Sequence, residues 1–421
     1  MKTAALLLLV ITFAGYVFLH PLGEELHLPI TKVSLQAHLE RYASVGHHRS
    51  GGEGDAATRD WLTSELREAG FDVELQSIPF EQWRHEEAFL EADGVQLEGF
   101  PLWWPPKDAA LRSVSGKLHW MADAGPGDIG VMSVDPYLLS SLNSEQRQSI
   151  IEGARRGLGG VIILTRTITG EPFAFNAESD FAGMAVLVLG SKYANAIDEL
   201  VSNQTPTRLS LQGAYESVET WNVIGRLNRA GAKTVVVSTP RTGWFNSGAE
   251  RGPGISLFIE LAHWAVQEGQ SDLVFVATGG HEIAHIGMDA FMKDGAPAPD
   301  KTENWVHLGA SIAAHAWKSP DERLHDTSTA QNTATRWIIF SENQTFSIYR
   351  RFRSLGYQFS PAHVSAFGET ADIHAAGYGR FLGFAGGHPY FHLPSDNADN
   401  TSGEMLAPVA LAIQKIMLDS L

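Results

Sequence analysis

The sequence predicts an α/β fold in which helices cover both faces of a central sheet and a smaller α/β domain is inserted. From Trp221 onward, strand-like and helix-like patterns alternate, which is the usual order of elements in α/β proteins. The unbroken apolar run Val235-Val236-Val237 is typical of a strand buried on both faces. Residues 88–218 have a different sequence pattern, in which short strands surround a glycine-rich stretch. We expect these residues to form the inserted domain.

Three elements are expected before the insertion. Residues 33–48 place Leu35, Leu39 and Tyr42 on one helical face. After a polar, glycine-rich turn, Asp55 is expected to cap a helix that ends before Gly70. Phe71, Val73 and Leu75 alternate with Asp72, Glu74 and Gln76, which indicates a half-buried strand.

The other expected elements follow from the same patterns. Inside the insertion we expect strands at 117–121, 130–134, 161–164 and 185–189, and helices at 144–156 and 193–201. After it we expect strands at 222–227, 234–238, 273–278 and 381–385, and helices at 254–268, 283–293, 327–340 and 344–355.

The composition limits which partners and which metal sites we expect for this protein. A chain of 421 residues that is 44% hydrophobic can bury a large core. The net charge of −17 and the lack of a Lys/Arg-rich run argue against a nucleic-acid partner. Because the chain has no cysteine, a metal ion would have to be bound by histidines and carboxylates.

The N-terminus predicts export. Lys2 precedes an apolar run that reaches Phe18, which is the pattern of a secretory signal over residues 1–20. The run is slightly short of the roughly 20 residues that a spanning helix needs. Since no small-x-small cleavage site follows, an uncleaved membrane anchor stays an alternative to a secreted or periplasmic protein.

Four segments, in the right order, resemble motifs of the zinc exopeptidases of the bacterial leucine aminopeptidase, glutamate carboxypeptidase and transferrin receptor type. They include His48-Arg49-Ser50-Gly51-Gly52, Trp221-Asn222-Val223-Ile224-Gly225, Gly279-Gly280-His281-Glu282 and Phe391-His392-Leu393-Pro394-Ser395-Asp396. The resemblance implies a peptidase-like domain with a mixed sheet over residues 31–85 and 219–421. It also implies that residues 88–218 are an insertion similar to a protease-associated domain.

In this family, two zinc ions are bound by His, Asp, Glu, Asp and His, and a further Glu is the general base. The matching positions here carry Arg241 for the first His and Arg251, or at best Glu250, for the bridging Asp. Glu282 and His392 match two ligands, and His281 stands at the general base. Because a guanidinium stays protonated and offers no lone pair to zinc, we expect Arg241 and Arg251 to pair with Glu282 in place of a two-zinc centre.

A competing motif is His281-Glu282-Ile283-Ala284-His285. On a continuous helix, two histidines four residues apart share one face and bind zinc, with the glutamate as base. This hypothesis allows one zinc ion on His281 and His285, with His392 or His388 as a further ligand. The preceding Gly279-Gly280 argues for a loop, in which case His285 is an ordinary helix residue.

We assign roles to the other candidate residues from the residues that flank them in the sequence. Glu369 either lines the site or caps the helix that follows it, and Asp396 is expected to orient the loop carrying His392. The loop containing His388 is expected to form a pocket wall, and Trp103-Trp104 forms either an exposed recognition patch or part of the insertion core.

These residues lead to two alternative hypotheses about function. We favour a non-catalytic or strongly divergent peptidase homologue that binds a peptide or protein ligand, because most metal ligands are replaced. The alternative is an active single-zinc metallopeptidase or cyclase-like enzyme that uses Glu282, His392 and His281. Fold-level analogy does not decide between them, since function depends on the site.

Overall fold

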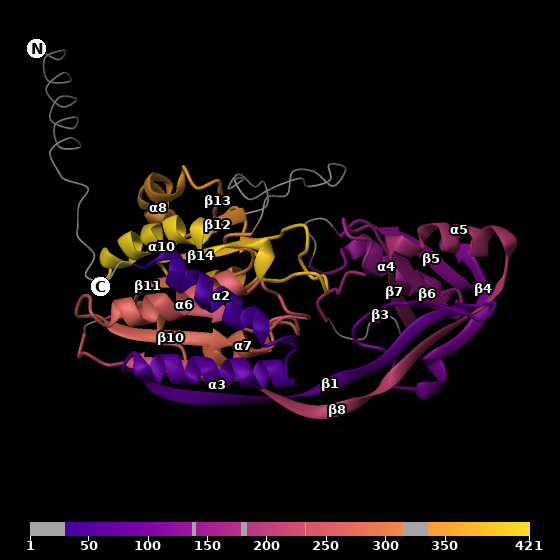
Figure 1. Cartoon of the computed structure of the whole chain (residues 1–421), viewed down its shortest axis with the longest axis horizontal. Helices are drawn as coiled ribbons and strands as arrows, with labels where there is room; N and C mark the ends of the chain where they lie inside the picture. The colour runs from indigo at the N-terminus through magenta and orange to yellow at the C-terminus, as the bar shows by residue number, and fades with distance from the viewer. Residues whose placement is uncertain (1–29, 137–139, 178–182, 232, 315–335) are drawn as a thin grey trace, which may run out of the picture.

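The computed structural model describes residues 30–136, 140–177, 183–231, 233–314 and 336–421. The expected signal segment and most of the expected helix at 327–340 lie outside these residues. Figure 1 shows two bodies joined by a long ribbon of two strands, β1 (Asp72–Ala92) and β8 (Pro206–Leu227). Among the described residues, no helix is both long and apolar enough to cross a membrane.

The larger body contains a mixed sheet. Its strands follow the order β13-β12-β14-β11-β9-β10-β8. Neighbours among β10, β9, β11 and β14 are parallel, whereas β8 pairs antiparallel with β10 and β12 pairs antiparallel with β14. The strand bounds are β9 (Thr234–Pro240), β10 (Asp272–Thr278), β11 (Thr302–His307), β12 (Arg336–Phe340), β13 (Gln358–Pro361) and β14 (Phe381–Gly386).

Helices cover both faces of this sheet, as β9 illustrates. Val235 and Val237 pack into a core under one set of helices, while Val236 packs into a second core on the other face. The first set is α2 (Lys32–Ser44), α3 (Glu53–Glu68), α6 (Gly252–Ala265), α8 (Thr345–Phe352) and α10 (Gly403–Leu418). The second is α7 (Ile286–Asp294) and α9 (Glu369–Ala375). The predicted α/β fold class is confirmed.

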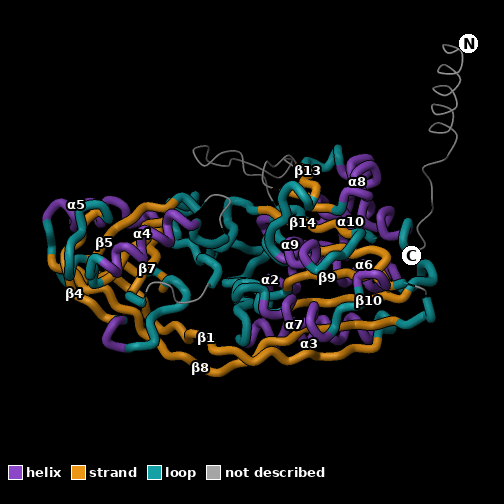
Figure 2. The backbone as a smooth tube through the Cα atoms, turned by 180° about the vertical axis from the view of Figure 1, so that it is seen from behind, coloured by secondary structure: helices purple, strands orange, loops and turns teal. Residues whose placement is uncertain are grey.

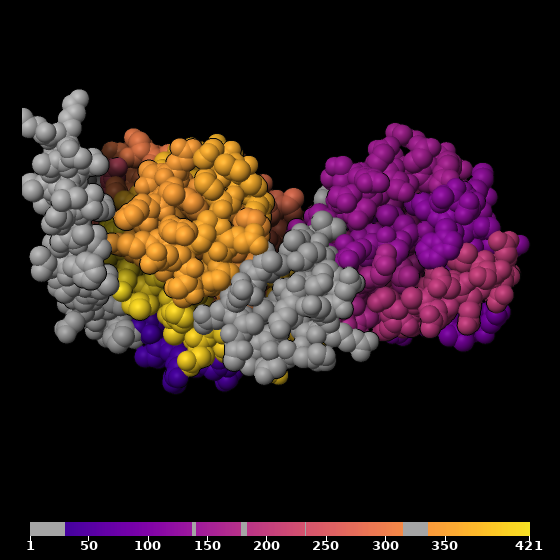
Figure 3. Space-filling view, turned by 90° about the horizontal axis from the view of Figure 1, so that it is seen from above, coloured from indigo at the N-terminus to yellow at the C-terminus, as the bar shows by residue number. Residues whose placement is uncertain are grey.

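In the smaller body the strand order continues from β8 into four parallel strands, the first of them antiparallel to β8, with the short β3 added antiparallel at the far edge. Separate apolar cores lie on the two faces of these strands. A helix that contains Ile150 packs into one core, and a helix that contains Ile197 packs into the other. Figure 3 shows this body as a distinct mass beside the larger one. Its elements are β2 (Val95–Glu98), β3 (Phe100–Pro101), β4 (Ser113–Trp120), β5 (Ile129–Val134), α4 (Ser144–Arg155), β6 (Gly160–Thr165), β7 (Ala185–Gly190) and α5 (Ala194–Asn203). The smaller body also contains the short 3-10 turns η1 (Ala109–Leu111) and η2 (Ser191–Tyr193). The larger body contains η3 (Pro299–Lys301), η4 (Glu342–Gln344) and η5 (Ala398–Asn400).

The ribbon of β1 and β8 was not expected at this length. The two strands pair antiparallel from Asp72 with Arg226 to Glu91 with Arg208, and Figure 2 shows them running beneath both bodies. The expected domain boundaries at 85/88 and 218/219 therefore fall inside strands, and the first coincides with a register shift between His85 and Glu87. The expected strands at 71–75 and 222–227 are only the outer ends of β1 and β8. Side chains along much of the remaining ribbon are exposed or half-buried, so the sequence does not mark its full length with an apolar pattern.

One expected element is wrong where the structure describes it. Residues 336–340, the end of an expected helix, form strand β12. Ile338, Ile339 and Phe340 are all buried, with Ile338 and Ile339 on opposite faces of the sheet. A short apolar run of this kind fits a buried strand and a buried helix equally well, so periodicity misassigned it.

Candidate functional site

The site lies where the parallel strands β9, β10, β11 and β14 end at one edge of the sheet. The residues that follow β9 and β10 include Arg241, Thr242, His281 and Glu282. Strand β11 ends in His307, and the loop after β14 carries His388 and His392. Clefts outside the carboxyl ends of strands are where open α/β sheets bind ligands.

An arginine–carboxylate cluster occupies the centre of the site. The Nη2 atom of Arg251 lies 2.9 Å from Oε1 of Glu250 and 3.0 Å from Oε1 of Glu282. Its Nε donates to the carbonyl of Thr242 at 3.0 Å, and the Thr242 hydroxyl donates to Oε2 of Glu282 at 2.8 Å. All four residues are buried, so this guanidinium neutralises carboxylates away from water.

The charges in this cluster shift the pKa values of its members. Burial alone would raise the pKa of Glu250, but Arg251 and then His392 outweigh it and hold that pKa far below its usual range. Burial would lower the pKa of Arg251, and the charges of Glu250 and Glu282 raise it instead. Glu250 and Arg251 are therefore both charged at neutral pH.

Arg241 does not pair with Glu282, which corrects one expectation. Its Nη1 pairs with the Asp55 carboxylate and donates to the Asp55 carbonyl at 2.7 Å, while Nη2 donates to the carbonyl of Trp221 at 2.6 Å. The second carboxylate oxygen of Asp55 accepts from the Thr220 hydroxyl at 2.8 Å and from the amide of Gly51 at 2.7 Å. Arg241 and Asp55 are both fully buried, and their pairing gives each of the two buried charges a partner of opposite sign.

His392 lies beside the cluster and is held by the inserted domain. Its Nδ1 is 2.7 Å from the carbonyl of Ala174, and its Nε2 is 3.3 Å from Oε1 of Glu250. The Ala174 amide donates back to the His392 carbonyl at 3.1 Å, and the Ala177 amide donates to the Glu282 carbonyl at 2.8 Å. Segment 172–177 thus contacts His392 and Glu282, two of the expected site residues.

Asp396 connects two loops of the site. Its carboxylate oxygens accept from the amides of Ala249 and Glu250, each at 3.0 Å, and one lies 3.2 Å from Nε2 of His388. The Nδ1 of His388 is 3.0 Å from the Ser311 hydroxyl. His388 is therefore an internal bridge, although Gly386 and Gly387 of its loop do line the neighbouring pocket.

The segment from His281 to His285 is not helical, so the zinc-binding helix that the motif requires is absent there. Helix α7 starts at Ile286, and Ala284 and His285 have φ values of +50° and +57°. His281 and His285 stack at 4.7 Å, and each Nδ1 lies 2.9 Å from a carboxylate, Glu369 and Asp372 respectively. Burial, then the charge of Arg251, lowers the pKa of His281, whereas Asp372 raises that of His285 against the effect of burial.

A pocket of about 390 Å³ opens beside the cluster. Of the expected site residues it is lined by Arg251, His281 and Glu369, and His307 joins them. Glu369 is at the start of α9 and fully buried, so it lines the pocket and begins the helix at once. The remaining lining residues are mostly apolar or glycine: Ser140, Gly309, Ala310, Trp337, Phe367, Gly368, Thr370, Phe384, Ala385, Gly386, Gly387 and Phe391.

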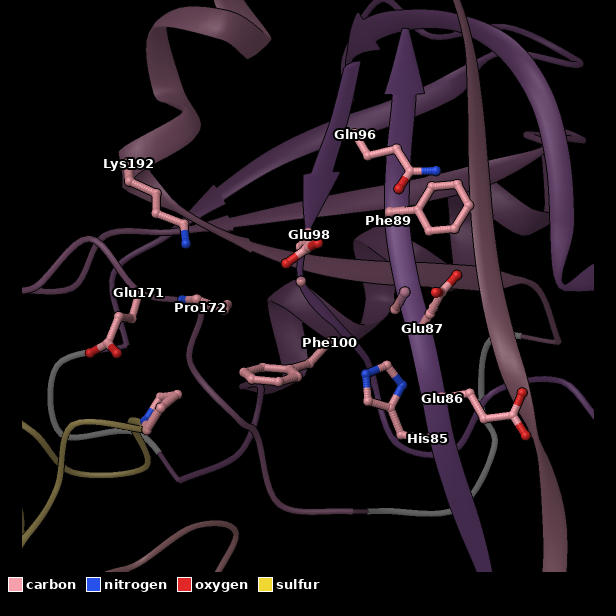
Figure 4. Close-up of a pocket in the computed structure, with 13 residues that line it drawn as sticks. His85, Glu86, Glu87, Phe89, Gln96, Glu98, Phe100, Glu171, Pro172 and Lys192 are labelled. Carbon is pink, nitrogen blue, oxygen red and sulfur yellow. The ribbon is translucent and has the colours of Figure 1, made fainter. Parts of the chain in front are cut away.

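A second pocket of about 360 Å³ lies between the inserted domain and the loop carrying Pro394 (Figure 4). Glu98 and Phe100 line it from one segment and Lys192 from another, and Glu86 and Glu87 lie on its strand β1 side. Glu86, Glu87, Glu98 and Lys192 are exposed to solvent, so most of the charged groups of this pocket stay hydrated. We place the candidate function at the Arg251 pocket.

Sequence reasoning missed three residues of the site. Asp55 was expected only as a helix cap, but Gly52 holds the cap position and Asp55 neutralises Arg241. Thr242 lies just after the predicted strand that became β9, and its polar side chain there was the available signal. His307 is the last residue of β11, a strand that the sequence pattern did not predict. Trp103, expected in a patch or in the insertion core, is buried and stacks at 5.1 Å on Trp244 of the larger body.

The residues present do not fit a zinc ion. The space between Glu250 and Glu282, where a metal would need lone pairs to converge, is filled by the Arg251 guanidinium. Across residues 30–136, 140–177, 183–231, 233–314 and 336–421, no group of three His, Asp or Glu side chains is arranged to hold a metal ion.

Comparison with known proteins supports the fold. No family model matches the sequence, and no curated protein matches it. A zinc aminopeptidase from Bacillus subtilis aligns with a TM-score of 0.71 and 16% identity, over 93% of this chain and 96% of its own. A peptidase M28 precursor from Shewanella amazonensis gives 0.66 and 15%, over 92% and 96%. An aminopeptidase from Aneurinibacillus sp. strain AM-1 gives 0.64 and 15%, over 92% and 93%. The chain therefore has the zinc-aminopeptidase fold.

Proposed function

We propose that this chain is an exported protein of the zinc-aminopeptidase fold that binds a peptide or protein ligand without a two-zinc centre. The observation that carries the proposal is the position of Arg251, whose Nη2 lies between the carboxylates of Glu250 and Glu282. One buried cation there takes the place of charge that metal ions would bring. Export rests on the apolar N-terminal segment, and the net charge of −17 argues against nucleic acid as the ligand.

The arrangement supports binding better than hydrolysis. A metallopeptidase needs a metal to polarise the scissile carbonyl and to lower the pKa of a water molecule. In this site the carboxylates that would hold the metal are already bound to a guanidinium. The pocket, in contrast, is large enough for a side chain or a small ligand and combines apolar walls with a few polar groups, as ligand sites usually do.

The test is the metal content of the purified full chain, measured by mass spectrometry after incubation with zinc and desalting. We expect substoichiometric zinc and no hydrolysis of aminoacyl anilides. Glu282→Gln, which keeps the hydrogen bond from Thr242, is the matched variant. One equivalent of zinc in the wild type that is lost in Glu282→Gln would overturn the proposal and favour a single-zinc enzyme.

A further inference from the structure

The outward face of helix α8 carries aromatic side chains, where the outer face of a surface helix is usually polar. Ile348 and Phe352 form the buried side of this helix and pack into the core of the larger body. On the outward side Phe346 is 76% exposed and Tyr349 is 54% exposed, and the two lie one helical turn apart. The helix therefore presents one apolar surface to the core and a second one to the outside.

Neighbouring residues extend this outward face into a patch. Single exposed apolar side chains are common on proteins, so their grouping is what matters here. The ring of Tyr349 contacts that of Phe359 in β13, with the two centroids 5.4 Å apart. Val364, in the turn that follows β13, is 70% exposed, and its neighbour His363 pairs with Glu342 in η4, just before α8. We call this surface the α8 patch, with its aromatic centre at Phe346, Tyr349 and Phe359.

Two arginines give the α8 patch a positive charge in a chain whose net charge is −17. Arg350 and Arg353 are exposed, four and seven positions after Phe346, and neither forms an ion pair within the described part of the chain. The guanidinium of Arg350 lies 6.0 Å from the centroid of the Phe346 ring. Arg351, between the two, pairs instead with Asp419 at 3.0 Å. A cation near a helix C-terminus is favourable by itself, so it is the unburied aromatic rings beside these arginines that indicate a partner.

An anionic lipid surface fits this combination of groups. Helices that lie in the membrane interface bury large apolar side chains among the headgroups and carry Lys or Arg beside them. Tyrosine rings are common at this level of a membrane, and basic side chains there attract anionic lipids. Figure 3 shows the orange surface of the larger body, to which α8 belongs, as a rounded face. Such a face can rest on a fluid membrane, whereas a protein partner would have to supply both a matching hollow and acidic groups opposite the arginines.

We propose that the α8 patch docks on the surface of a membrane that contains anionic lipids, with Phe346 and Tyr349 among the headgroups and Arg350 and Arg353 at the lipid phosphates. The inference goes beyond the proposed function, because none of these four residues lines the Arg251 pocket. The contact does not depend on the apolar N-terminal segment, so it forms whether that segment is cleaved or kept.

The experiment uses the full chain, which has no cysteine, so that one introduced cysteine can carry the fluorophore NBD at a single position. Ser354→Cys places the label beside Arg353 at an exposed position without removing a residue of the patch. Val95→Cys, an exposed position on β2 of the smaller body, is the control. With vesicles of phosphatidylcholine and phosphatidylglycerol we expect the emission of the label at position 354 to rise and move to shorter wavelength, and that of the control to stay unchanged. Vesicles that bind the protein while neither label responds would show that the N-terminal segment alone makes the contact, and would overturn the proposal.

Substitutions in the patch test its chemistry by the same titration. Arg350→Gln and Arg353→Gln should each weaken binding to the anionic vesicles about 5-fold, and added salt should weaken the binding of the unsubstituted chain. Phe346→Ala should weaken it about 10-fold, because it removes the most exposed aromatic ring of the patch. The matched controls are Arg84→Gln, an exposed arginine of the ribbon, and Trp120→Ala in the smaller body, and neither should change the binding.

All of these side chains are exposed, so each variant should fold as the unsubstituted chain does. Equal binding by the unsubstituted chain and Phe346→Ala, or equal affinity for vesicles with and without phosphatidylglycerol, contradicts the proposal. A change in emission that follows the protein concentration and needs no vesicles would mean that a second copy of the chain covers the patch, and it would also overturn the proposal.

Discussion

At the scale of single residues, two arginines explain how the site is held together. Arg251 joins Glu250 and Glu282, and Arg241 joins Asp55, in places where water does not reach. Asp55 and Arg241 are 186 positions apart in the sequence, whereas Arg251 joins its neighbour Glu250 to Glu282, which is 31 positions away. A buried ion pair is costly to break from one side, because the remaining charge has neither a partner nor water.

We therefore expect Arg241→Met to lower the free energy of unfolding by about 3–5 kcal/mol. The physical reason is the uncompensated carboxylate of Asp55, which stays fully buried. Urea denaturation followed by circular dichroism measures the change. Arg84→Met is the control, because Arg84 and Glu216 form an exposed pair whose loss should cost less than about 1 kcal/mol. Equal costs for the two variants would contradict the buried-pair account.

His285 predicts a pH dependence of stability. Asp372 raises its pKa in the folded state above 6.5 against the effect of burial, so the pair stabilises the fold fully below pH 6.5 and loses this effect as pH rises through the raised value. We expect His285→Gln to lower the Tm by about 1–3 °C at pH 6 and by less at pH 9. Thermal unfolding across this range measures it. A larger decrease of the Tm at pH 9 than at pH 6 would contradict the stabilising pair of protonated His285 with Asp372.

At the scale of elements, the loop between β10 and α7 determines where His281 and Glu282 point. Gly287 allows α7 to start against this loop. A Cβ atom at Gly287 would lie 2.1 Å from the carbonyl oxygen of Gly279 and 2.6 Å from Oδ1 of Asn222. The first turn of α7 thus packs on this loop by close backbone contact, and the positive φ values of Ala284 and His285 keep the residues of the His-Glu-x-x-His motif out of the helix.

Gly287→Ala should therefore destabilise the protein by about 1–3 kcal/mol, as overpacking does, although alanine normally favours a helix. Gly379→Ala is the control, because a Cβ there meets nothing within 4 Å and the backbone does not have a positive φ. Thermal unfolding of both variants provides the comparison. A neutral or stabilising Gly287→Ala would mean that the loop can move away from the helix.

At the scale of the whole molecule, the inserted domain is part of the candidate site. Trp103 stacks on Trp244 of the larger body, and Trp244 donates to the Asn176 side chain at 3.2 Å. Asn176 lies in the segment whose neighbours Ala174 and Ala177 bind the backbone of His392 and Glu282. The position of the insertion therefore fixes two residues of the site.

Trp244→Ala should loosen this contact. We expect faster hydrogen exchange at the amides of Ala174 and Ala177, because the stacking and the hydrogen bond that hold segment 172–177 are lost. Hydrogen–deuterium exchange with mass spectrometry measures it. Trp120→Ala, at a partly exposed position of the insertion, should leave both amides protected. Unchanged exchange in Trp244→Ala would show that other contacts hold the segment.

The sequence by itself determined the α/β class and most of the buried strands and helices of the larger body. These depend on local apolar patterns and on glycine at turns, which neighbouring residues reveal. Only the tertiary structure decided that Arg241 pairs with Asp55, that the motif at His281 is a loop and that β1 and β8 join two bodies. Charge pairing and strand pairing bring together residues distant in the chain, and a single sequence shows which charges exist but not which of them meet.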